Sequence, residues 1–224
     1  MILSCEAVIF DLDGVLIDST AVVERVWEDW ATQIGMEPAA LMAVAHGRRS
    51  VDTIRLVAPH LDAEAEAHRL EGLETSLSEG LGLIPGAPQL INSLPDRQWA
   101  VVTSGMATTA TARLAFAGLP IPQVLVTGND VQHGKPDPQG YRLAAERLGT
   151  LPANCIVIED APAGISAAKA AGMKVIAVMT THAASELTEA DVRVSRLSEL
   201  TILPAEQVLR GSSPSIQIEL ASNT

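Results

Sequence analysis

The 224-residue sequence is poor in aromatic side chains, with two Phe, three Trp and one Tyr. Since 47% of its residues are nevertheless hydrophobic, the core must be built from Ala, Val, Leu and Ile. No apolar run approaches the roughly 18 residues of a membrane-spanning helix, so we expect no segment that crosses a membrane. This composition also excludes disorder as a description of the whole chain.

Positive charge is scarce as well. The chain has 15 Lys and Arg against 27 Asp and Glu, a formal net charge of −12, and its three lysines are Lys135, Lys169 and Lys174. That charge repels nucleic acid and anionic membranes, and it argues against either as a partner. Cys5 and Cys155 are too few for a disulfide framework. Because the opening MILSCEAVIF also lacks the cationic start of a signal peptide, we expect a cytoplasmic protein. We also expect it to act as a monomer.

Short apolar runs alternate with Ala- and Leu-rich stretches of helical spacing. The runs that resemble buried strands are residues 7–10, 99–103, 123–127, 155–158 and 175–178. The helical stretches among the later runs are residues 107–117, 141–148 and 165–171. Strands that are apolar on both faces and joined by helices are typical of a parallel sheet covered on both sides. We therefore predict an α/β fold with a Rossmann-like parallel sheet core.

The alternation breaks after the first strand. Residues 19–79 contain helical periods over 21–34, 39–45, 51–57 and 63–78, and no convincing strand. If these were ordinary crossover helices, two strands would be missing. We predict an inserted α-helical cap domain at 17–80, the Rossmann-like core at 1–16 and 81–204, and a C-terminal tail at 205–224. The alternating patch 215–220 in the tail suits an edge strand, a packing arm or a disordered segment.

Two carboxylates follow the first buried strand in the segment VIFDLDG, which contains Asp11, Asp13 and Gly14. Ligands of open α/β sheets bind beyond the carboxyl ends of the strands. Two acids at that point repel each other unless a cation lies between them or one is protonated. Asp-x-Asp-Gly also occurs as a simple solvated turn, so this segment alone does not decide the function.

Three other segments at strand ends favour a catalytic role. Ser104 and Gly105 offer a hydroxyl and backbone N–H groups to an anion, and Lys135 lies in the proline-framed loop HGKPDP. Glu159 and Asp160 end a further buried strand, and Mg²⁺ is the ion that such an all-oxygen site prefers. A nucleophilic carboxylate, a cation, a hydroxyl and a lysine together suit phosphoryl transfer through an aspartyl phosphate.

These segments, in this order, resemble the haloacid dehalogenase superfamily of phosphohydrolases over about residues 7–194. The resemblance implies that Asp11 is the nucleophile and that Asp13 is the general acid and then the base. It implies a phosphate-binding hydroxyl at Ser104, next to Gly105, and a charge-stabilising lysine at Lys135.

The same resemblance implies a metal site. Mg²⁺ would be held by the Asp11 carboxylate, the Asp13 backbone carbonyl and Asp160, with Glu159 in the acidic metal motif but farther from the ion. The helical insertion matches the cap that part of the superfamily carries.

Within the superfamily, the sequence is most similar to the glycerol-3-phosphatase and 2-deoxyglucose-6-phosphatase group. The similarity lies in the cap segment HGRR, which begins at His46, and in motifs around residues 129–136 and 159–165. We expect His46, Arg49 and Asp18 to contact the substrate. For Arg49, a structural ion pair with a cap carboxylate stays open, and Asp18 could instead cap the next helix.

Several other functions are disfavoured. Dehalogenation would not need the metal motif, and phosphonate hydrolysis needs a cap lysine, which residues 15–82 lack. Ser104 has no Gly-x-Ser-x-Gly elbow, and no dinucleotide fingerprint is present. We predict a Mg²⁺-dependent phosphatase that acts on small polyol or sugar phosphate monoesters. A sugar phosphomutase of the same fold is the alternative, and the intact acids disfavour a non-catalytic interaction protein.

Overall fold

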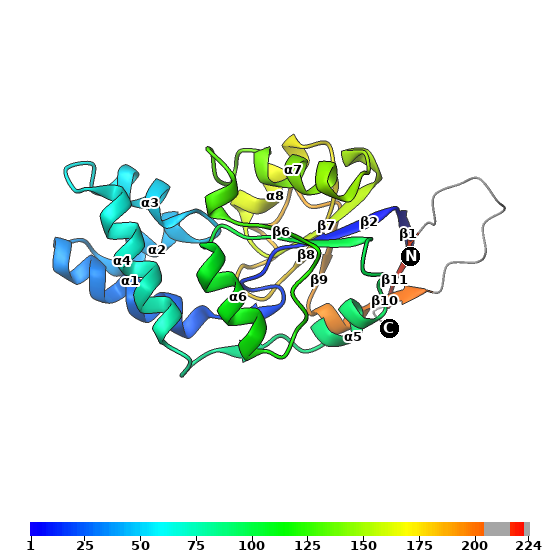
Figure 1. Cartoon of the computed structure of the whole chain (residues 1–224), viewed down its shortest axis with the longest axis horizontal. Helices are drawn as coiled ribbons and strands as arrows, with labels where there is room; N and C mark the ends of the chain where they lie inside the picture. Colours follow the sequence, from blue (N-terminus) through cyan, green and yellow to red (C-terminus); the bar gives the residue numbers. More distant parts are fainter. Residues whose placement is uncertain (204–215, 222–224) are drawn as a thin grey trace.

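The computed structural model describes residues 1–203 and 216–221. Its core is a six-stranded parallel sheet, with a group of helices at one end (Figure 1). The strand order is β6 (Val124–Val126), β5 (Trp99–Val102), β2 (Ala7–Phe10), β7 (Cys155–Glu159), β8 (Lys174–Val178) and β9 (Val192–Val194). The α/β fold predicted from the sequence is confirmed, and the five predicted strands are β2 and β5 to β8.

Helices cover both faces of this sheet. α7 (Gln139–Leu148) and α8 (Pro162–Ala170) pack on one face, and α5 (Ala87–Asn92) and α6 (Ala107–Phe116) pack on the other. Alternate residues of β2 enter the two apolar clusters, with Val8 and Phe10 on the side of α5 and α6, and Ala7 and Ile9 on the side of α7 and α8. This two-sided burial explains why the strands read as unbroken apolar runs.

The cap consists of four helices with their own apolar core. They are α1 (Thr20–Ile34), α2 (Pro38–Ala45), α3 (Ser50–Val57) and α4 (Ala63–Ser76). Trp27 and Trp30 pack edge to face at 5.6 Å inside this core, as expected for residues that serve helix packing. Two short antiparallel strands, β3 (Ile17–Asp18) and β4 (Gly82–Leu83), carry the chain into the cap and out of it.

A third, antiparallel sheet lies at the end opposite the cap (Figure 1). Its order is β1 (Ile2–Cys5), β11 (Ile216–Leu220) and β10 (Leu200–Leu203). The alternating patch near the C-terminus is therefore the middle strand of a small sheet. Its residues Ile216, Ile218 and Leu220 pack in the core, although they lie in the segment that we predicted as a separate tail. The first residue of the predicted patch, 215, lies outside the described residues.

Single turns of 3₁₀ helix lie at Gly128–Asp130, Pro152–Asn154 and Leu197–Glu199. Within the described part of the chain, no helix has the length and apolar character needed to cross a membrane.

Candidate active site

The predicted catalytic residues meet where the central strands of the sheet end beneath the cap. Asp11 follows β2 and Ser104 lies two residues after β5. Glu159 is the last residue of β7, and Asp160 comes directly after it. Because β5 and β7 are the two neighbours of β2, their ends place these side chains on either side of Asp11. A cavity of about 110 Å³ opens at this point, and residues from both the core and the cap line it.

Lys135 connects the buried acids. Its Nζ lies 2.9 Å from Asp11 Oδ1 and 2.7 Å from Glu159 Oε1. Glu159 Oε1 also accepts a hydrogen bond from the Tyr141 hydroxyl at 3.0 Å, and its Oε2 accepts two from backbone N–H groups, at 2.8 and 2.9 Å. These four hydrogen bonds fix the Glu159 carboxylate, and Glu159 in turn fixes the position of the Lys135 ammonium group.

The charges of this cluster shift one another's pKa values. Burial raises the pKa of Asp11 to about 7, against the attraction of Lys135 and with the repulsion of Glu159 and Asp13. Burial also raises the pKa of Asp160 well above its usual value, and the neighbouring Glu159 and Asp11 add to the shift. Burial pushes the pKa of Glu159 upward too, but Lys135 and the hydrogen bonds hold it below its usual value. The site therefore contains more carboxyl groups than Lys135 alone can keep ionised.

The acids fit a bound cation. One carboxylate oxygen from each of Asp11, Glu159 and Asp160 lies within 4.8 Å of the others. Asp160 Oδ2 accepts a hydrogen bond from the Thr181 hydroxyl, whereas Asp160 Oδ1 is buried and has no hydrogen-bond partner among the described residues. A buried carboxylate oxygen without a donor is costly unless a cation meets it, and hard divalent cations prefer such oxygens.

Two glycines make this packing possible. Gly14 has φ +77°, and a Cβ built on it would lie 2.1 Å from Asp160 Oδ2. A Cβ on Gly164, in the first turns of α8, would lie 1.5 Å from Glu159 Oε1. Any side chain at either position would displace an acid of the site.

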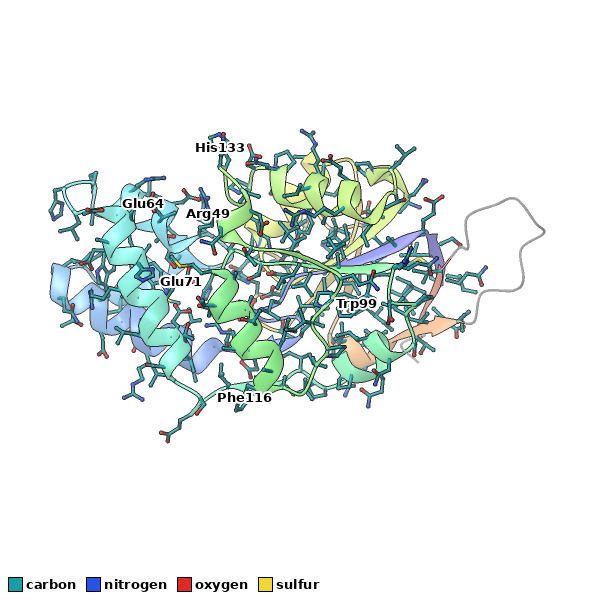
Figure 2. All side chains as sticks on the ribbon, viewed as in Figure 1. Arg49, Glu64, Glu71, Trp99, Phe116 and His133 are labelled. Atoms are coloured by element: carbon teal, nitrogen blue, oxygen red, sulfur yellow. The ribbon has the colours of Figure 1, made fainter. Side chains whose placement is uncertain are left out.

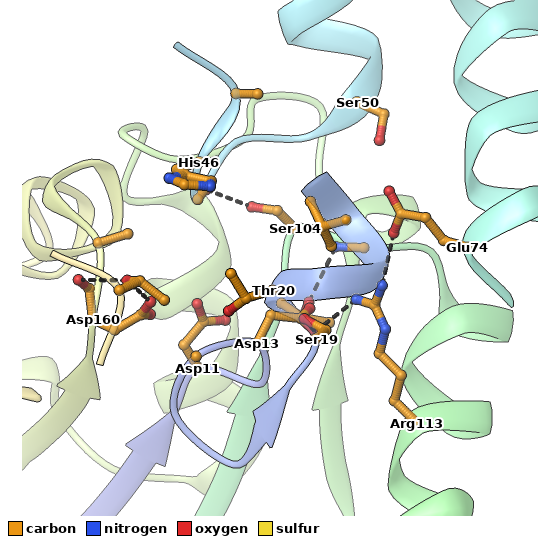
Figure 3. Close-up of a pocket in the computed structure, with 18 of the residues that line it drawn as sticks. Asp11, Asp13, Ser19, Thr20, His46, Ser50, Glu74, Ser104, Arg113 and Asp160 are labelled. Carbon is orange, nitrogen blue, oxygen red and sulfur yellow. Dashed lines mark hydrogen bonds and ion pairs between the residues drawn. The ribbon is translucent and has the colours of Figure 1, made fainter. Parts of the chain in front are cut away.

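Asp13 has different surroundings from Asp11. Its Oδ1 accepts hydrogen bonds from the Ser19 hydroxyl at 2.7 Å and from Arg113 Nη1 at 2.6 Å. Arg113 Nη2 in turn donates to Glu74 Oε2 of the cap at 2.7 Å, so this guanidinium lies between a core acid and a cap acid (Figure 3). Burial raises the pKa of Glu74 to about 7, with Arg113 acting against that shift.

The cap loop between α2 and α3 forms the roof of the cavity. The Ser104 hydroxyl donates to the carbonyl of Gly47 at 2.9 Å. His46 lines the cavity and meets the ring of His182 edge to face at 5.4 Å. Burial, and then His182, lower the pKa of His46, which favours its neutral form. Gly105 lines the same cavity, and its N–H donates to the Thr103 hydroxyl at 3.1 Å.

The structure does not bring Arg49 to this cavity. Its guanidinium forms a two-armed ion pair with Asp52, at 2.7 and 2.9 Å. It also donates to the backbone carbonyls of Val131 and Gln132, each at 2.8 Å, in the core loop after β6. Figure 2 shows Arg49 where the cap meets the core. Of the two readings left open by the sequence, the structural ion pair is the one observed, because Asp52 follows one helical turn later.

Asp18 is likewise away from the cavity. It is exposed, and its carboxylate accepts a hydrogen bond from the backbone N–H of Thr20 at 3.2 Å, at the start of α1. Asp18 precedes the N-cap residue Ser19, so this hydrogen bond satisfies the first N–H of α1 but is not an N-cap bond.

Several residues that line the cavity were not predicted from the sequence: Ser19, Thr20, Ser50, Glu71, Glu74, Thr103, Arg113, Thr181 and His182. Most had no local signal. Arg113 stands out as the single charged residue of α6 (ATTATARLAF), but the sequence does not tell whether that charge is exposed or is buried and therefore paired.

The chain belongs to the haloacid dehalogenase-like hydrolase family, which matches residues 5–172. The family predicted from the sequence is thus confirmed. Hydrolases of this family generally use a divalent metal ion, and the acidic cluster described above provides a place for one.

Curated relatives are similar over most of their length. The chain is 41% identical to hexitol phosphatase A of Escherichia coli (strain K12), over 88% of this chain and 94% of the relative. It is 36% identical to glycerol-1-phosphate phosphohydrolase 2 of Saccharomyces cerevisiae (80% and 76%). Identity to 2-deoxyglucose-6-phosphate phosphatase 1 of the same yeast is 32% (89% and 91%).

Solved structures share the architecture. CbbY from Rhodobacter sphaeroides, in complex with phosphate, superimposes with a TM-score of 0.75 at 26% identity, covering 87% of this chain and 96% of that one. β-Phosphoglucomutase from Clostridium difficile superimposes with a TM-score of 0.76, over 88% and 93% of the two chains. At 22% identity, the likeness to the mutase concerns the fold alone.

Proposed function

We propose that this protein is a Mg²⁺-dependent phosphatase of small polyol or sugar phosphate monoesters, which acts through an aspartyl phosphate at Asp11. One observation carries the proposal. The buried Asp11 carboxylate lies 2.9 Å from Lys135 Nζ and close to the Asp160 carboxylate, whose Oδ1 has no hydrogen-bond partner among the described residues, at the floor of a cavity that the cap covers. Nucleophile, cation and metal ligand are the parts that phosphoryl transfer to a carboxylate requires.

The residues divide the reaction between them. An Asp11 oxygen attacks phosphorus, and the ester P–O bond breaks with its electron pair on the leaving oxygen, which takes a proton from the Asp13 carboxyl group. A water molecule then attacks the phosphoaspartate and gives a proton to Asp13, and the P–O bond to Asp11 breaks to release phosphate. Lys135 stays in place to offset charge because Glu159 holds it at 2.7 Å.

We propose the Asp11 carboxylate, the Asp13 backbone carbonyl and Asp160 as the metal ligands. Bound there, Mg²⁺ would supply positive charge against the incoming phosphate. The four donors on Glu159 favour a role for it in holding Lys135 over direct ligation.

The cavity wall supports a neutral, hydroxyl-rich leaving group. Beyond Asp11 the wall presents hydroxyls and carboxylates: Ser19, Thr20, Ser50, Glu71 and Glu74. Among the described residues that line it, Arg113 is the one Lys or Arg, and two carboxylates already engage it. Glycerol or a sugar finds hydrogen-bond partners there, with His46, Ser104 and Gly105 as proposed substrate contacts. Lys135, whose Nζ lies 2.9 Å from Asp11 Oδ1, is proposed to contact the phosphate group instead.

The same wall disfavours the mutase alternative. A mutase that transfers phosphate between two hydroxyls of one sugar through an aspartyl phosphate must hold a sugar bisphosphate. Its second phosphate would face Glu71 and Glu74 with no free cation among the lining residues described. The phosphatase names of the relatives point the same way. We further propose a cytoplasmic monomer without nucleic acid or membrane partners, given the net charge of −12.

A phosphate-release screen tests the proposal. Wild type and Asp11→Asn are assayed against hexitol, hexose, pentose and glycerol phosphates, sugar bisphosphates, nucleotides and phosphopeptides. We expect wild type to release phosphate from the first four classes, and Asp11→Asn to be inactive because an amide cannot attack phosphorus. Interconversion of two sugar phosphates without phosphate release would identify a mutase. Preference for nucleotides or phosphopeptides, or turnover by Asp11→Asn, would contradict the proposal.

A further inference from the structure

Arg113 lies at the one point where a core acid and a cap acid share a cation among the described residues. The residue is 4% exposed and extends from α6 of the core. Nη1 lies 2.6 Å from Asp13 Oδ1, and Nη2 lies 2.7 Å from Glu74 Oε2 on α4 of the cap. Asp13 and Glu74 together raise the pKa of Arg113, although burial acts against them, so the guanidinium stays charged.

Other contacts show that α4 is seated on α6 around this ion pair. The backbone N–H of Met106 donates to Glu71 Oε2 at 2.6 Å, and the hydroxyls of Thr75 and Thr109 are hydrogen-bonded at 2.8 Å. These contacts already join the two helices. The hydrogen bond from Arg113 Nη1 to Asp13 joins two residues of the core, so it does not help to hold α4 against α6 and must have another role.

That explanation lies in the two oxygens of Asp13. Both observed donors, Ser19 and Arg113, bind Oδ1, and within the described residues no donor meets Oδ2. A carboxyl group fixed through one oxygen presents the other in a constant direction. Misplacement of a catalytic group by about 1 Å can cost about 10²-fold in rate, so such fixing matters for proton transfer.

We propose that Arg113 is a positioning residue for Asp13. Arg113 holds Oδ1 of Asp13, so that Oδ2 of the same carboxyl group exchanges protons with the ester oxygen and then with water. Because Glu74 binds the other arm of the guanidinium, this arrangement is complete only when the cap is seated. The inference rests on the proposed phosphatase reaction. The planar guanidinium is essential to it, since a lysine ammonium at the same position cannot present two donors in a fixed fork to two different acids.

The test compares two substrates with different leaving groups, in the wild-type enzyme and in the Asp13→Asn variant. Arg113→Gln and Arg113→Lys are assayed for kcat/KM with a polyol phosphate, whose leaving oxygen needs a proton, and with p-nitrophenyl phosphate, whose leaving oxygen does not. We expect Arg113→Gln to lose about tenfold or more with the polyol phosphate and less than about threefold with the aryl phosphate. In an Asp13→Asn background, the same change should cost less than about threefold with either substrate. Arg113→Lys should recover little of the loss.

Two further variants keep the outcome decisive. If Arg113→Gln leaves Glu74 as an unpaired buried acid and does not fold, Arg113→Gln/Glu74→Gln removes both charges and takes its place. Arg69→Gln breaks the exposed pair Arg69–Glu66 on the same cap helix, and we expect it to match wild type with both substrates.

Equal losses with both substrates, or a full additional loss in the Asp13→Asn background, would overturn the positioning role and leave a structural one. A wild-type protein that releases no phosphate from either ester would instead overturn the proposed function.

Discussion

Asp11 and Asp13 are two residues apart in the sequence, yet they lie in different electrostatic surroundings. The Asp11 carboxylate is buried and faces Lys135, whereas the Asp13 side chain is 29% exposed and faces Arg113 and Ser19. Two carboxylates with different environments are what a nucleophile and a general acid–base group require. Ser19 is only six residues from Asp13, whereas Lys135 and Arg113 lie about 100 residues or more beyond the motif in the sequence.

The first prediction concerns the proton on the leaving group. Asp13→Asn should lower kcat/KM for a polyol phosphate by about 10²–10⁴-fold, because the departing alkoxide then leaves without a proton. The loss should be much smaller for an aryl phosphate, which is a good leaving group. Steady-state kinetics with both esters measure this difference. Equal losses would rule out Asp13 as the acid.

A second prediction at this scale concerns His46 and pH. Burial and the ring of His182 lower its pKa below the usual 6.5, with Glu186 acting against them. The unfolded chain therefore binds a proton on His46 at a higher pH than the folded chain does. The stability that neutral His46 contributes is present above about pH 6.5 and is lost as the pH falls toward the lowered pKa.

His46→Gln should accordingly lose less free energy of unfolding than wild type between about pH 7.5 and pH 5.5. Urea unfolding at both pH values gives the comparison, and His68→Gln, at an exposed position on α4, is the control. Parallel losses in wild type and His46→Gln would show that His46 is not held neutral by the fold.

At the scale of an element, α8 can begin beside the site because Gly164 leaves room for Glu159. Gly164→Ala would place a Cβ 1.5 Å from Glu159 Oε1, and we expect a loss of about 1–3 kcal/mol in stability together with a fall in activity, since Lys135 loses its anchor. Gly72→Ala is the matched control, because Gly72 is an exposed residue of α4 and a Cβ there would meet nothing within 4 Å. That change should stabilise the protein by up to about 1 kcal/mol. Chemical denaturation and phosphate release distinguish the two variants, and a neutral Gly164→Ala would show that Glu159 has another packing available.

The α2–α3 loop is a second element with a testable role. Arg49 fastens this loop to the carbonyls of Val131 and Gln132, whereas the neighbouring Arg48 forms no such contact among the described residues. We expect Arg49→Ala to lower kcat/KM by about tenfold or more for polyol and aryl phosphates alike, because the position of the roof affects every substrate. Arg48→Ala should behave as wild type. A loss confined to polyol phosphates would contradict this role and would support the direct substrate contact of Arg49 that we expected from the sequence.

These elements also show why the sequence predicted some features and missed others. The five strands and the four cap helices were predicted because burial on both faces and helical spacing are local patterns. The catalytic motifs follow strand ends, so their meeting at one edge could be inferred from the order of the strands. β1 has no comparable signal, because its partner β11 lies more than 200 residues later. Arg113, Glu74 and the ion pair of Arg49 depend on how the cap is seated, which no local pattern records.

At the scale of the whole molecule, the negative charge is concentrated rather than spread evenly. Twelve acids and five bases between residues 18 and 79 give the cap −7 of the total −12. The cap is seated over a core site that contains four more acids, Asp11, Asp13, Glu159 and Asp160. A phosphate ester must enter this field, and Lys135 alone does not reverse it. Binding of a divalent cation should therefore matter for the stability of the fold as well as for catalysis.

The last prediction follows from that linkage. A ligand that binds only the folded state at a hundred times its Kd adds about 2.7 kcal/mol of stability, which for a chain of this size raises Tm by about 5–10 °C. We expect this rise when Mg²⁺ is added to chelator-treated protein, and we expect activity to disappear on chelation and to return with the ion. Asp160→Asn should abolish the rise in Tm, because Asp160 Oδ1 is the buried oxygen that has no other partner among the described residues. Asp96→Asn removes the same unit of charge at an exposed position remote from the site, and it should keep the full rise. If both variants gained equal stability from Mg²⁺, the ion would be acting on the net charge of the molecule and not at the acidic cluster. If the enzyme were fully active in excess chelator, the cluster would not be a metal site, and protons on Asp11 and Asp160 would have to balance its charge.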